Sequence, residues 1–521
     1  MPLARTRGVA LVGVDGHLVE VEADLGTGVP SYSLVGLPDA SLTESRDRVR
    51  AAMTNSDQHW PATKRVTVNL SPASLPKRGS SFDVAIAAAI LAAQGVVPQH
   101  AFDDAVLLGE LGLDGRVRPV RGVLPAVVAA ARAGVGAAVV PAANAAEAAL
   151  VPGVRVTGVR TLAGLVARAN GDEPPDLELA EDAAPPVDPA EDDPAHRPDL
   201  ADVLGQATAR YLLEVAAAGG HHLLMSGPPG AGKTMLAERL PGLLPPLDRA
   251  AALEVTAVHS VAGSLRDGTG PLIAHPPFQA PHHTASVAAI VGGGSAQVRP
   301  GSASLAHRGV LFMDEAPEFA PAVLDALREP LESGEITVAR LAARVRFPAR
   351  FQLVLAANPC PCGLAATAPG ADTGCTCTPM ARLRYLGRLS GPLLDRVDLR
   401  IEMLAATRAD LRGGAGPPET TAAVAERVAA ARDRMAARLA GTPWRVNAEV
   451  PGHVLRRLWR LPWEVVGEAE RLLDRGVLTA RGVDRVVRVA WTLADLAGRA
   501  VPDAGDVRVA LDCRGVARWA A

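Results

Sequence analysis

The chain has 521 residues, of which 48% are hydrophobic and 3% aromatic, and its formal net charge is −3. This composition suits globular cores built from alanine, valine and leucine, and the length suggests roughly three domains. The longest apolar stretch, 84–97, contains Gln94 and Gly95 and is too short to cross a bilayer. The first residues lack the apolar core of a signal peptide, so we expect a soluble, cytoplasmic protein without a membrane partner.

The first expected domain, residues 1–168, alternates short apolar strands with alanine-rich helices. The pattern predicts a strand at 66–70, a helix at 82–93 and a strand at 137–141. An α/β fold follows from this alternation.

This region resembles the proteolytic domain of Lon, which implies a ribosomal S5 domain 2-like α/β fold. The segment 75–81 puts Ser81 at that family's nucleophile position, whereas Leu124 stands where its lysine belongs. Leucine cannot activate a serine hydroxyl, and nothing in the sequence shows that Lys77 or Arg78 reaches Ser81. We interpret the domain as a protease fold without peptidase activity that serves ring assembly or nucleic-acid contact. An ATP-dependent protease is the alternative.

An acidic, proline-rich linker is predicted at 169–199. Residues 172–199 hold eleven acids, seven prolines and one base, Arg197, a balance of −10. Subtracting this from the chain total of −3 leaves +7 for the rest of the chain. Such a segment buries too little apolar surface to fold, so it separates the first domain from the next.

A phosphate-binding loop of the form G-x-x-x-x-G-K-[ST] follows, between an expected strand at 221–226 and an expected helix from residue 235. Its residues are Gly227, Pro228, Pro229, Gly230, Ala231, Gly232, Lys233 and Thr234. Glycines let the backbone N–H groups point at phosphate oxygens. Lys233 can reach the β- and γ-phosphates, and the Thr234 hydroxyl can ligate Mg²⁺. The motif predicts binding of a nucleoside triphosphate, ATP.

Two further buried strands end in polar residues that complete this chemistry. The run 309–313 ends in Asp314 and Glu315, and the run 351–357 ends in Asn358. Asp314 can hold Mg²⁺ through water, and Glu315 can polarise the attacking water. Asn358 could orient that water or touch the γ-phosphate. Singly, such residues often cap helices, but their order behind a phosphate loop favours a nucleotide site.

Several motifs of this region resemble the magnesium-chelatase-like group, and within it the YifB/ComM family. They are Asp199-Leu-Ala-Asp-Val-Leu-Gly-Gln206, Pro281-His-His-Thr-Ala-Ser286, Val291-Gly-Gly-Gly-Ser295, Asn358-Pro-Cys-Pro-Cys-Gly363 and Ser390-Gly-Pro-Leu-Leu-Asp-Arg-Val-Asp398. The resemblance implies an AAA+ P-loop ATPase core at 200–405, with inserts and a cysteine loop, and a helical lid at 406–521. It also implies an ATP-driven ring, a hexamer, that acts on single-stranded or branched DNA as a branch-migration helicase. A magnesium-chelatase-type motor subunit is the alternative.

The family resemblance also gives roles to arginines. Arg396 resembles the arginine finger that reaches a neighbouring subunit's ATP, where a guanidinium stabilises charge on the γ-phosphate. Arg481, at the start of a helix capped by Thr479, stands where the second sensor arginine contacts nucleotide from the lid. Arg485 is the competing assignment, and a surface ion pair is the alternative for either.

Two inserts could meet the substrate. Residues 263–304 are rich in glycine, proline and histidine, and in the family this region projects toward the ring axis. Within it, His282 and His283 should point opposite ways in an extended segment and serve loop structure or DNA contact. Residues 335–351 predict a hairpin, and its arginines suit DNA phosphates, with a solvated face as the alternative: Arg340, Arg344, Arg346 and Arg350. The scarcity of aromatic residues favours backbone tracking over base stacking.

Four of the five cysteines lie in one loop, as two C-x-C pairs separated by twelve residues. They are Cys360, Cys362, Cys375 and Cys377. Disulfides are not expected in a cytoplasmic protein, and four thiolates can surround a structural Zn²⁺. Free thiols in a flexible loop are the alternative, and the remaining Cys513 should be a buried apolar residue.

Overall fold

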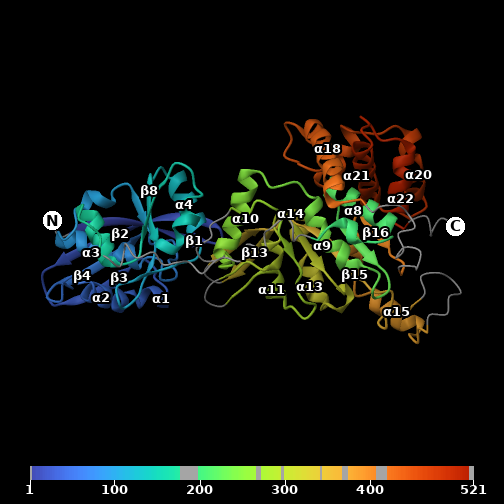
Figure 1. The fold of residues 1–521 in the computed structure, drawn as a ribbon. Helices are drawn as coiled ribbons and strands as arrows, with labels where there is room; N and C mark the ends of the chain where they lie inside the picture. The colour runs from blue at the N-terminus through green and yellow to red at the C-terminus, as the bar shows by residue number, and fades with distance from the viewer. Residues whose placement is uncertain are drawn as a thin grey trace.

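The structure is a computed structural model that describes residues 3–175, 198–265, 272–294, 298–340, 343–365, 374–405 and 419–515. Most of the predicted acidic linker, 176–197, and the start of the predicted lid, 406–418, lie outside the described residues. Figure 1 shows three successive parts: an N-terminal part in blue and teal, a central sheet in green and yellow, and C-terminal helices in orange and red.

Over its described residues, the N-terminal part contains three sheets flanked by helices. Its strands are β1 (Leu3–Val12), β2 (Asp15–Gly26), β3 (Ser31–Val35), β4 (Arg65–Ser71), β5 (Ala105–Leu107), β6 (Glu110–Leu111), β7 (Val117–Arg118), β8 (Ala137–Pro141) and β9 (Arg155–Val159). Its helices are α1 (Ala40–Thr43), α2 (Ser45–Asn55), α3 (Asp83–Gln94), α4 (Val123–Arg132), α5 (Ala145–Ala148) and α6 (Leu162–Asn170). One sheet is mixed, with the order β1-β2-β4-β3, and a second is parallel, with the order β5-β8-β9. Strands β6 and β7 form a third, two-stranded antiparallel sheet.

The expected strands and helix of this part are confirmed as β4, β8 and α3. Helix α3 is buried from Asp83 to Leu91 and packs on β1 and β2, because its alanines allow close approach from every side. Asp83, at its first turn, is fully buried and pairs with the guanidinium of Arg48 at 2.6 Å. This contact compensates the burial of a carboxylate inside an otherwise apolar core.

The central part is built on a five-stranded parallel sheet with the order β11-β12-β15-β10-β16. Its strands are β10 (Leu223–Ser226), β11 (Phe278–Gln279), β12 (Val310–Met313), β15 (Gln352–Ala357) and β16 (Leu399–Glu402). Every residue of β12 and β15 is buried, as their apolar sequences indicate. Because all five strands run the same way, their carboxyl ends meet at one edge, and the phosphate loop follows β10 there.

Helices and one hairpin surround this sheet. The helices are α8 (Ala207–Gly219), α9 (Lys233–Leu243), α10 (Arg249–Ala262), α11 (Val287–Val291), α12 (Ser302–Leu305), α13 (Pro321–Ala326), α14 (Pro330–Ser333), α15 (Pro379–Leu386) and α16 (Gly391–Leu394). The hairpin predicted at 335–351 is confirmed as β13 (Glu335–Arg340) paired with β14 (Ala343–Pro348).

The C-terminal part is helical over its described residues. It contains α18 (Thr421–Leu439), α19 (Gly452–Arg457), α20 (Trp463–Asp474), α21 (Ala480–Leu496) and α22 (Ala504–Asp512). The Thr479 hydroxyl caps α21 as expected, accepting a hydrogen bond from the Gly482 N–H. In the part of the chain that the structure describes, no helix combines the length and apolar character needed to cross a membrane.

The N-terminal part packs directly on the central part. Helix α4 lies against α10, and the Ser260 hydroxyl of α10 donates to the buried Glu147 carboxylate. Beside this contact, Val345 and Phe347 of the hairpin are buried against the turn between β1 and β2. The hairpin therefore has one apolar face occupied by the N-terminal part.

Candidate nucleotide and zinc sites

Lys233 is the centre of the phosphate loop. Gly232 has a φ of +89°, a left-handed conformation that turns the chain into α9 and places Lys233 at its first position. The Lys233 ammonium donates to the Gly227 carbonyl at 2.7 Å and to Asn358 Oδ1 at 3.0 Å. Burial lowers the pKa of Lys233, opposed by the nearby Asp314 and Glu315 carboxylates. Strand β15 thus brings its terminal amide to the phosphate loop.

The hydroxyl and carboxylate expected to hold Mg²⁺ are also adjacent. Thr234 Oγ1 donates to Asp314 Oδ2 at 2.7 Å, joining the start of α9 to the end of β12. Two oxygen ligands of this kind at one point fit a Mg²⁺ ion that also contacts substrate phosphates. Glu315 follows with its side chain exposed, so it can meet a water molecule in front of the sheet edge.

The expectation for His282 and His283 is wrong in one respect. Their rings do not point opposite ways: the ring centroids lie 4.1 Å apart. The chain turns after His282, because the Ala285 N–H donates to the His282 carbonyl at 2.9 Å. His283 Nδ1 then lies 3.4 Å from Glu315 Oε2. Sequence reasoning missed this neighbour of the nucleotide site, and only the paired histidines of the motif hinted at a special role.

The four clustered cysteines converge, with all four sulfur atoms within 4.8 Å of one another. Cys360 Sγ lies 3.2 Å from Cys362 Sγ and 3.7 Å from Cys375 Sγ. Zinc–sulfur bonds of about 2.3 Å in a tetrahedron separate the sulfurs by about 3.8 Å, so the donor set fits Zn²⁺. The Arg382 guanidinium donates to Cys375 Sγ at 3.2 Å, the kind of contact that stabilises a ligating thiolate.

The cysteine loop adjoins the phosphate loop. A Cβ on Gly363 would lie 2.6 Å from Pro229 Cγ, so only glycine allows this close approach. Cys360 also follows Asn358 by two residues. A change in the conformation of the cysteine loop is therefore expected to move Asn358. Cys513 is buried among the C-terminal helices, as expected.

Arg396 and Arg481 lie near the amino ends of the strands, opposite the phosphate loop of their own chain. The Arg396 guanidinium pairs with Glu332 and donates to the Pro392 carbonyl at 2.6 Å. Arg481 is exposed at the first turn of α21, and its charge contributes to lowering the pKa of Arg396, an effect led by burial. Glu332 and Arg481 line one cavity of about 840 Å³. Arg481 therefore does not reach the nucleotide site of its own chain.

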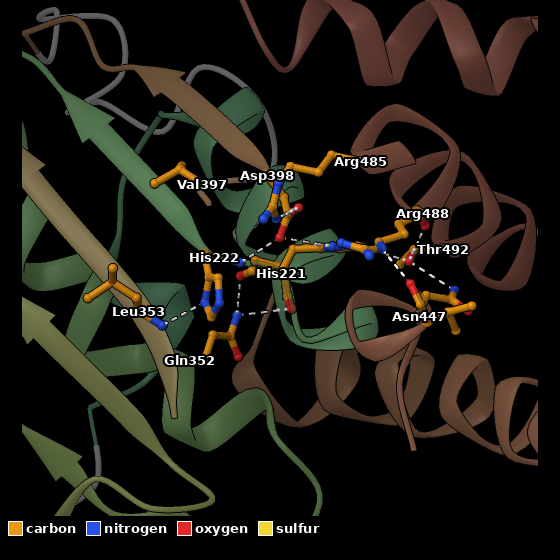
Figure 2. Close-up of polar contacts among 12 residues, drawn as sticks. His221, His222, Gln352, Leu353, Val397, Asp398, Asn447, Arg485, Arg488 and Thr492 are labelled. Carbon is orange, nitrogen blue, oxygen red and sulfur yellow. Dashed lines mark hydrogen bonds and ion pairs between the residues drawn. The ribbon is translucent and has the colours of Figure 1, made fainter. Parts of the chain in front are cut away.

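Arg485, the competing assignment, is part of a buried polar network at this amino edge (Figure 2). It donates to Asp398 Oδ1 at 2.6 Å, and the His222 N–H donates to Asp398 Oδ2 at 3.1 Å. The Asp398 carboxyl is fully buried; burial opposes ionisation, but Arg485 and the histidines hold its pKa well below the usual value. Arg485 is thus occupied in joining α21 to the sheet.

The hairpin arginines lie on the opposite face from its apolar contacts. Arg344 and Arg346 are exposed, alternating with the buried Val345 and Phe347. Arg350 is exposed just after the hairpin, and the side chain of Arg340 lies outside the described residues.

At the predicted nucleophile position of the N-terminal part, Ser81 lines a cavity of about 310 Å³ closed by Val261 and Val345 from the central part. Leu124 is fully buried in an apolar cluster, so no base occupies the position that the comparison with Lon assigned to lysine. The buried Lys77 ammonium donates to the Pro72 carbonyl.

Comparisons with known proteins show the family to which the chain belongs. Three family models match in succession: subunit ChlI of Mg-chelatase at 21–144, magnesium chelatase subunit ChlI at 199–411, and its C-terminal region at 418–514. Competence protein ComM from Haemophilus influenzae is 41% identical over 500 residues, covering 96% of this chain and 94% of that protein. Protein YifB from Escherichia coli is 40% identical over 496 residues, covering 95% and 94%. The chain belongs to the YifB/ComM family.

Other relatives extend this result. A Mycobacterium tuberculosis protein is 54% identical over 517 residues, covering 99% of both chains. A shorter match, 32% identical over 146 residues, covers 26% of this YifB/ComM chain and 18% of Lon protease from Roseiflexus castenholzii. The mixed α/β fold with parallel sheets agrees with an AAA+-type motor, and the partial match to Lon protease agrees with a chain that is Lon-like over part of its length.

Proposed function

We propose that this protein is an ATP-hydrolysing AAA+ ring motor that acts on DNA, as a branch-migration helicase in recombination or natural transformation. The observation that carries the proposal is the convergence of Lys233, Asn358, Thr234 and Asp314 at one sheet edge, with Glu315 beside them. The name of the Haemophilus influenzae relative, competence protein ComM, supports the link to transformation.

Each residue of this edge has a distinct task in ATP hydrolysis. The Lys233 ammonium leaves backbone carbonyls for phosphate oxygens, while Thr234 and Asp314 hold Mg²⁺, which neutralises phosphate charge when bound. Glu315 accepts a hydrogen bond from the attacking water, and Asn358 orients that water or the γ-phosphate. The phosphate-loop N–H groups stabilise the same charge.

A ring explains why Arg396 and Arg481 lie away from their own phosphate loop. In a hexamer, the amino edge of one subunit would face the nucleotide edge of the next. Arg396, released from Glu332, would then act as the finger on the neighbour's γ-phosphate, with Arg481 beside it. Arg396 and Arg481 lie on the same face of the subunit, which supports contact of both with the nucleotide of the same neighbour.

DNA contact is assigned to the exposed hairpin arginines, Arg344 and Arg346, and to the 263–304 insert. Guanidinium groups suit phosphate oxygens, and few aromatic residues are present for base stacking. Zn²⁺ at the four clustered cysteines would keep the loop beside Asn358 ordered. ATP-driven DNA remodelling by this protein would take place in the cytoplasm, where ATP, DNA and reduced thiols occur together.

The test is the ATPase rate against single-stranded, duplex and branched DNA, with particle imaging of the ATP-bound form. We expect stimulation by single-stranded or branched DNA and closed rings with ATP. The Lys233→Ala variant serves as the inactive control. An ATPase indifferent to every DNA, in a protein that stays monomeric with ATP, would overturn the proposal.

A further inference from the structure

His283 approaches Glu315 because the two segments leave the same edge of the sheet. Strand β11 pairs in parallel with β12, so the chain after Gln279 emerges beside the residues that follow Met313. His283 Nδ1 reaches a distance of 3.4 Å from Glu315 Oε2. The side chains are 34% and 49% exposed, respectively, so both remain accessible to water and substrate.

The His283 ring is supported from behind. His282 Nδ1 lies 2.8 Å from Thr284 Oγ1, a contact within the turn that fixes the His282 ring. The two imidazoles then lie against each other at an interplanar angle of 33°. This bracing limits the rotamers of His283, so its contact with Glu315 has a defined direction.

Among the residues that the structure describes, His283 is the hydrogen-bonding or ionic partner of the Glu315 side chain, whereas the Glu315 backbone is fixed separately. Its φ is +50°, a left-handed conformation that is strained for a non-glycine residue. The Glu315 N–H donates to Asp314 Oδ1 at 2.9 Å, which holds this conformation. Beyond the backbone, the exposed side chain has three rotatable bonds, and a neighbouring imidazole can select one arrangement of the carboxylate.

We propose that His283 is a positioning residue for Glu315: its imidazole orients the carboxylate that accepts a hydrogen bond from the attacking water. This inference deepens the proposed ATPase function and rests on it. A base that is itself oriented by a third group is a recurring arrangement in catalysis, because misplacement by about 1 Å costs up to about a hundredfold in rate. His283 touches Glu315, and its effect passes through that side chain.

Steady-state ATP hydrolysis by His283→Leu, His283→Asn and wild-type protein tests this role. For His283→Leu we expect kcat to fall by about tenfold or more and KM to stay within about twofold, because the ATP contacts remain. The Asn amide can donate from near the Nδ1 position, so His283→Asn should retain at least about a third of the wild-type kcat. His100→Ala, an exposed histidine of the N-terminal part, is the matched control and should match wild type.

A double variant separates positioning from an independent effect. If His283 acts through Glu315, adding His283→Leu to Glu315→Gln should cause no further loss of residual single-turnover hydrolysis. Wild-type kcat in His283→Leu, with Glu315→Gln inactive, would overturn the inference and leave the ATPase proposal standing. Equal losses in His283→Leu and His283→Asn, with lowered melting temperatures, would also overturn it. Wild-type turnover in Glu315→Gln would instead reject the proposed function.

Discussion

Lys233 Nζ and Asn358 Oδ1 lie 3.0 Å apart, although 125 residues separate them in the sequence. The contact joins the first residue of α9 to the residue after β15, across the carboxyl edge of the sheet. The contact places the uncharged Asn358 amide beside the Lys233 ammonium that would hold phosphate. A residue proposed for ATP binding therefore lies next to a residue proposed for hydrolysis.

Lys233→Ala and Glu315→Gln should separate these tasks. Lys233→Ala removes the charge that meets the phosphates, so we expect ATP binding to be lost. Glu315→Gln keeps the shape but replaces the carboxylate by a neutral amide that cannot take a proton from water, so binding should persist while turnover falls about 100-fold or more. Fluorescent-nucleotide titration and phosphate release measure the two effects. Normal turnover in Glu315→Gln would mean that another group activates the water.

The cysteine cluster should carry one zinc ion per chain. Replacing Cys360 or Cys375 by Ser removes a ligand, so we expect zinc content to fall and the melting temperature to drop. The ATPase rate should fall as well, because Asn358 precedes Cys360 by two residues. Elemental analysis and thermal unfolding are the measurements, and Cys513→Ala is the control that should keep its zinc. Wild-type protein purified without any metal would contradict this prediction.

The amino-edge network should make the protein sensitive to acid. Burial lowers the pKa of His222 to about 4, against 6.5 unfolded, so the unfolded state takes up this proton first as the pH falls. Stability should therefore decrease between pH 6.5 and 4, by about 3 kcal/mol from this group. Asp398, with its depressed pKa, adds a loss below pH 3.8.

Unfolding midpoints measured across this pH range, for wild type and His222→Asn, test this account. The Asn oxygen can still accept from the Leu353 N–H, the bond that His222 Nδ1 accepts at 3.0 Å, but it does not titrate (Figure 2 shows this contact). The variant should lose less stability than wild type between pH 6.5 and 4. Identical pH profiles would show that another group is responsible.

The N-terminal part should have no peptidase activity. Leu124 is fully buried at the position where a lysine would be needed, and a serine without a base stays protonated. We expect no casein cleavage by the wild-type protein with ATP, and an unchanged ATPase rate in Ser81→Ala. Casein cleavage that disappears in Ser81→Ala would show that another base activates the serine.

The sequence predicted most elements that position the nucleotide site, because buried parallel strands and phosphate loops have strong local patterns. Strands β12 and β15 are examples; the cap at Thr479, outside this site, was also predicted correctly. His283 was missed because its neighbour Glu315 comes from another strand, and pairing between strands is not encoded locally. Arg481 was expected to contact nucleotide from the lid, and the sequence does not show which subunit's nucleotide it could meet; α21, which carries Arg481, packs against the amino edge of the sheet through Arg485 and Asp398. The face on which a helical domain docks depends on such long-range contacts.

ATP hydrolysis in mixtures of two inactive variants tests most directly whether cleavage occurs between subunits. Arg396→Ala alone should lose about a thousandfold in rate, and Glu315→Gln alone should also be inactive. In mixed rings, a Glu315→Gln subunit supplies Arg396 to the intact site of an Arg396→Ala neighbour, so the ATPase rate should recover in part. Mixed rings that form but stay as inactive as either variant alone would contradict a nucleotide site shared between subunits.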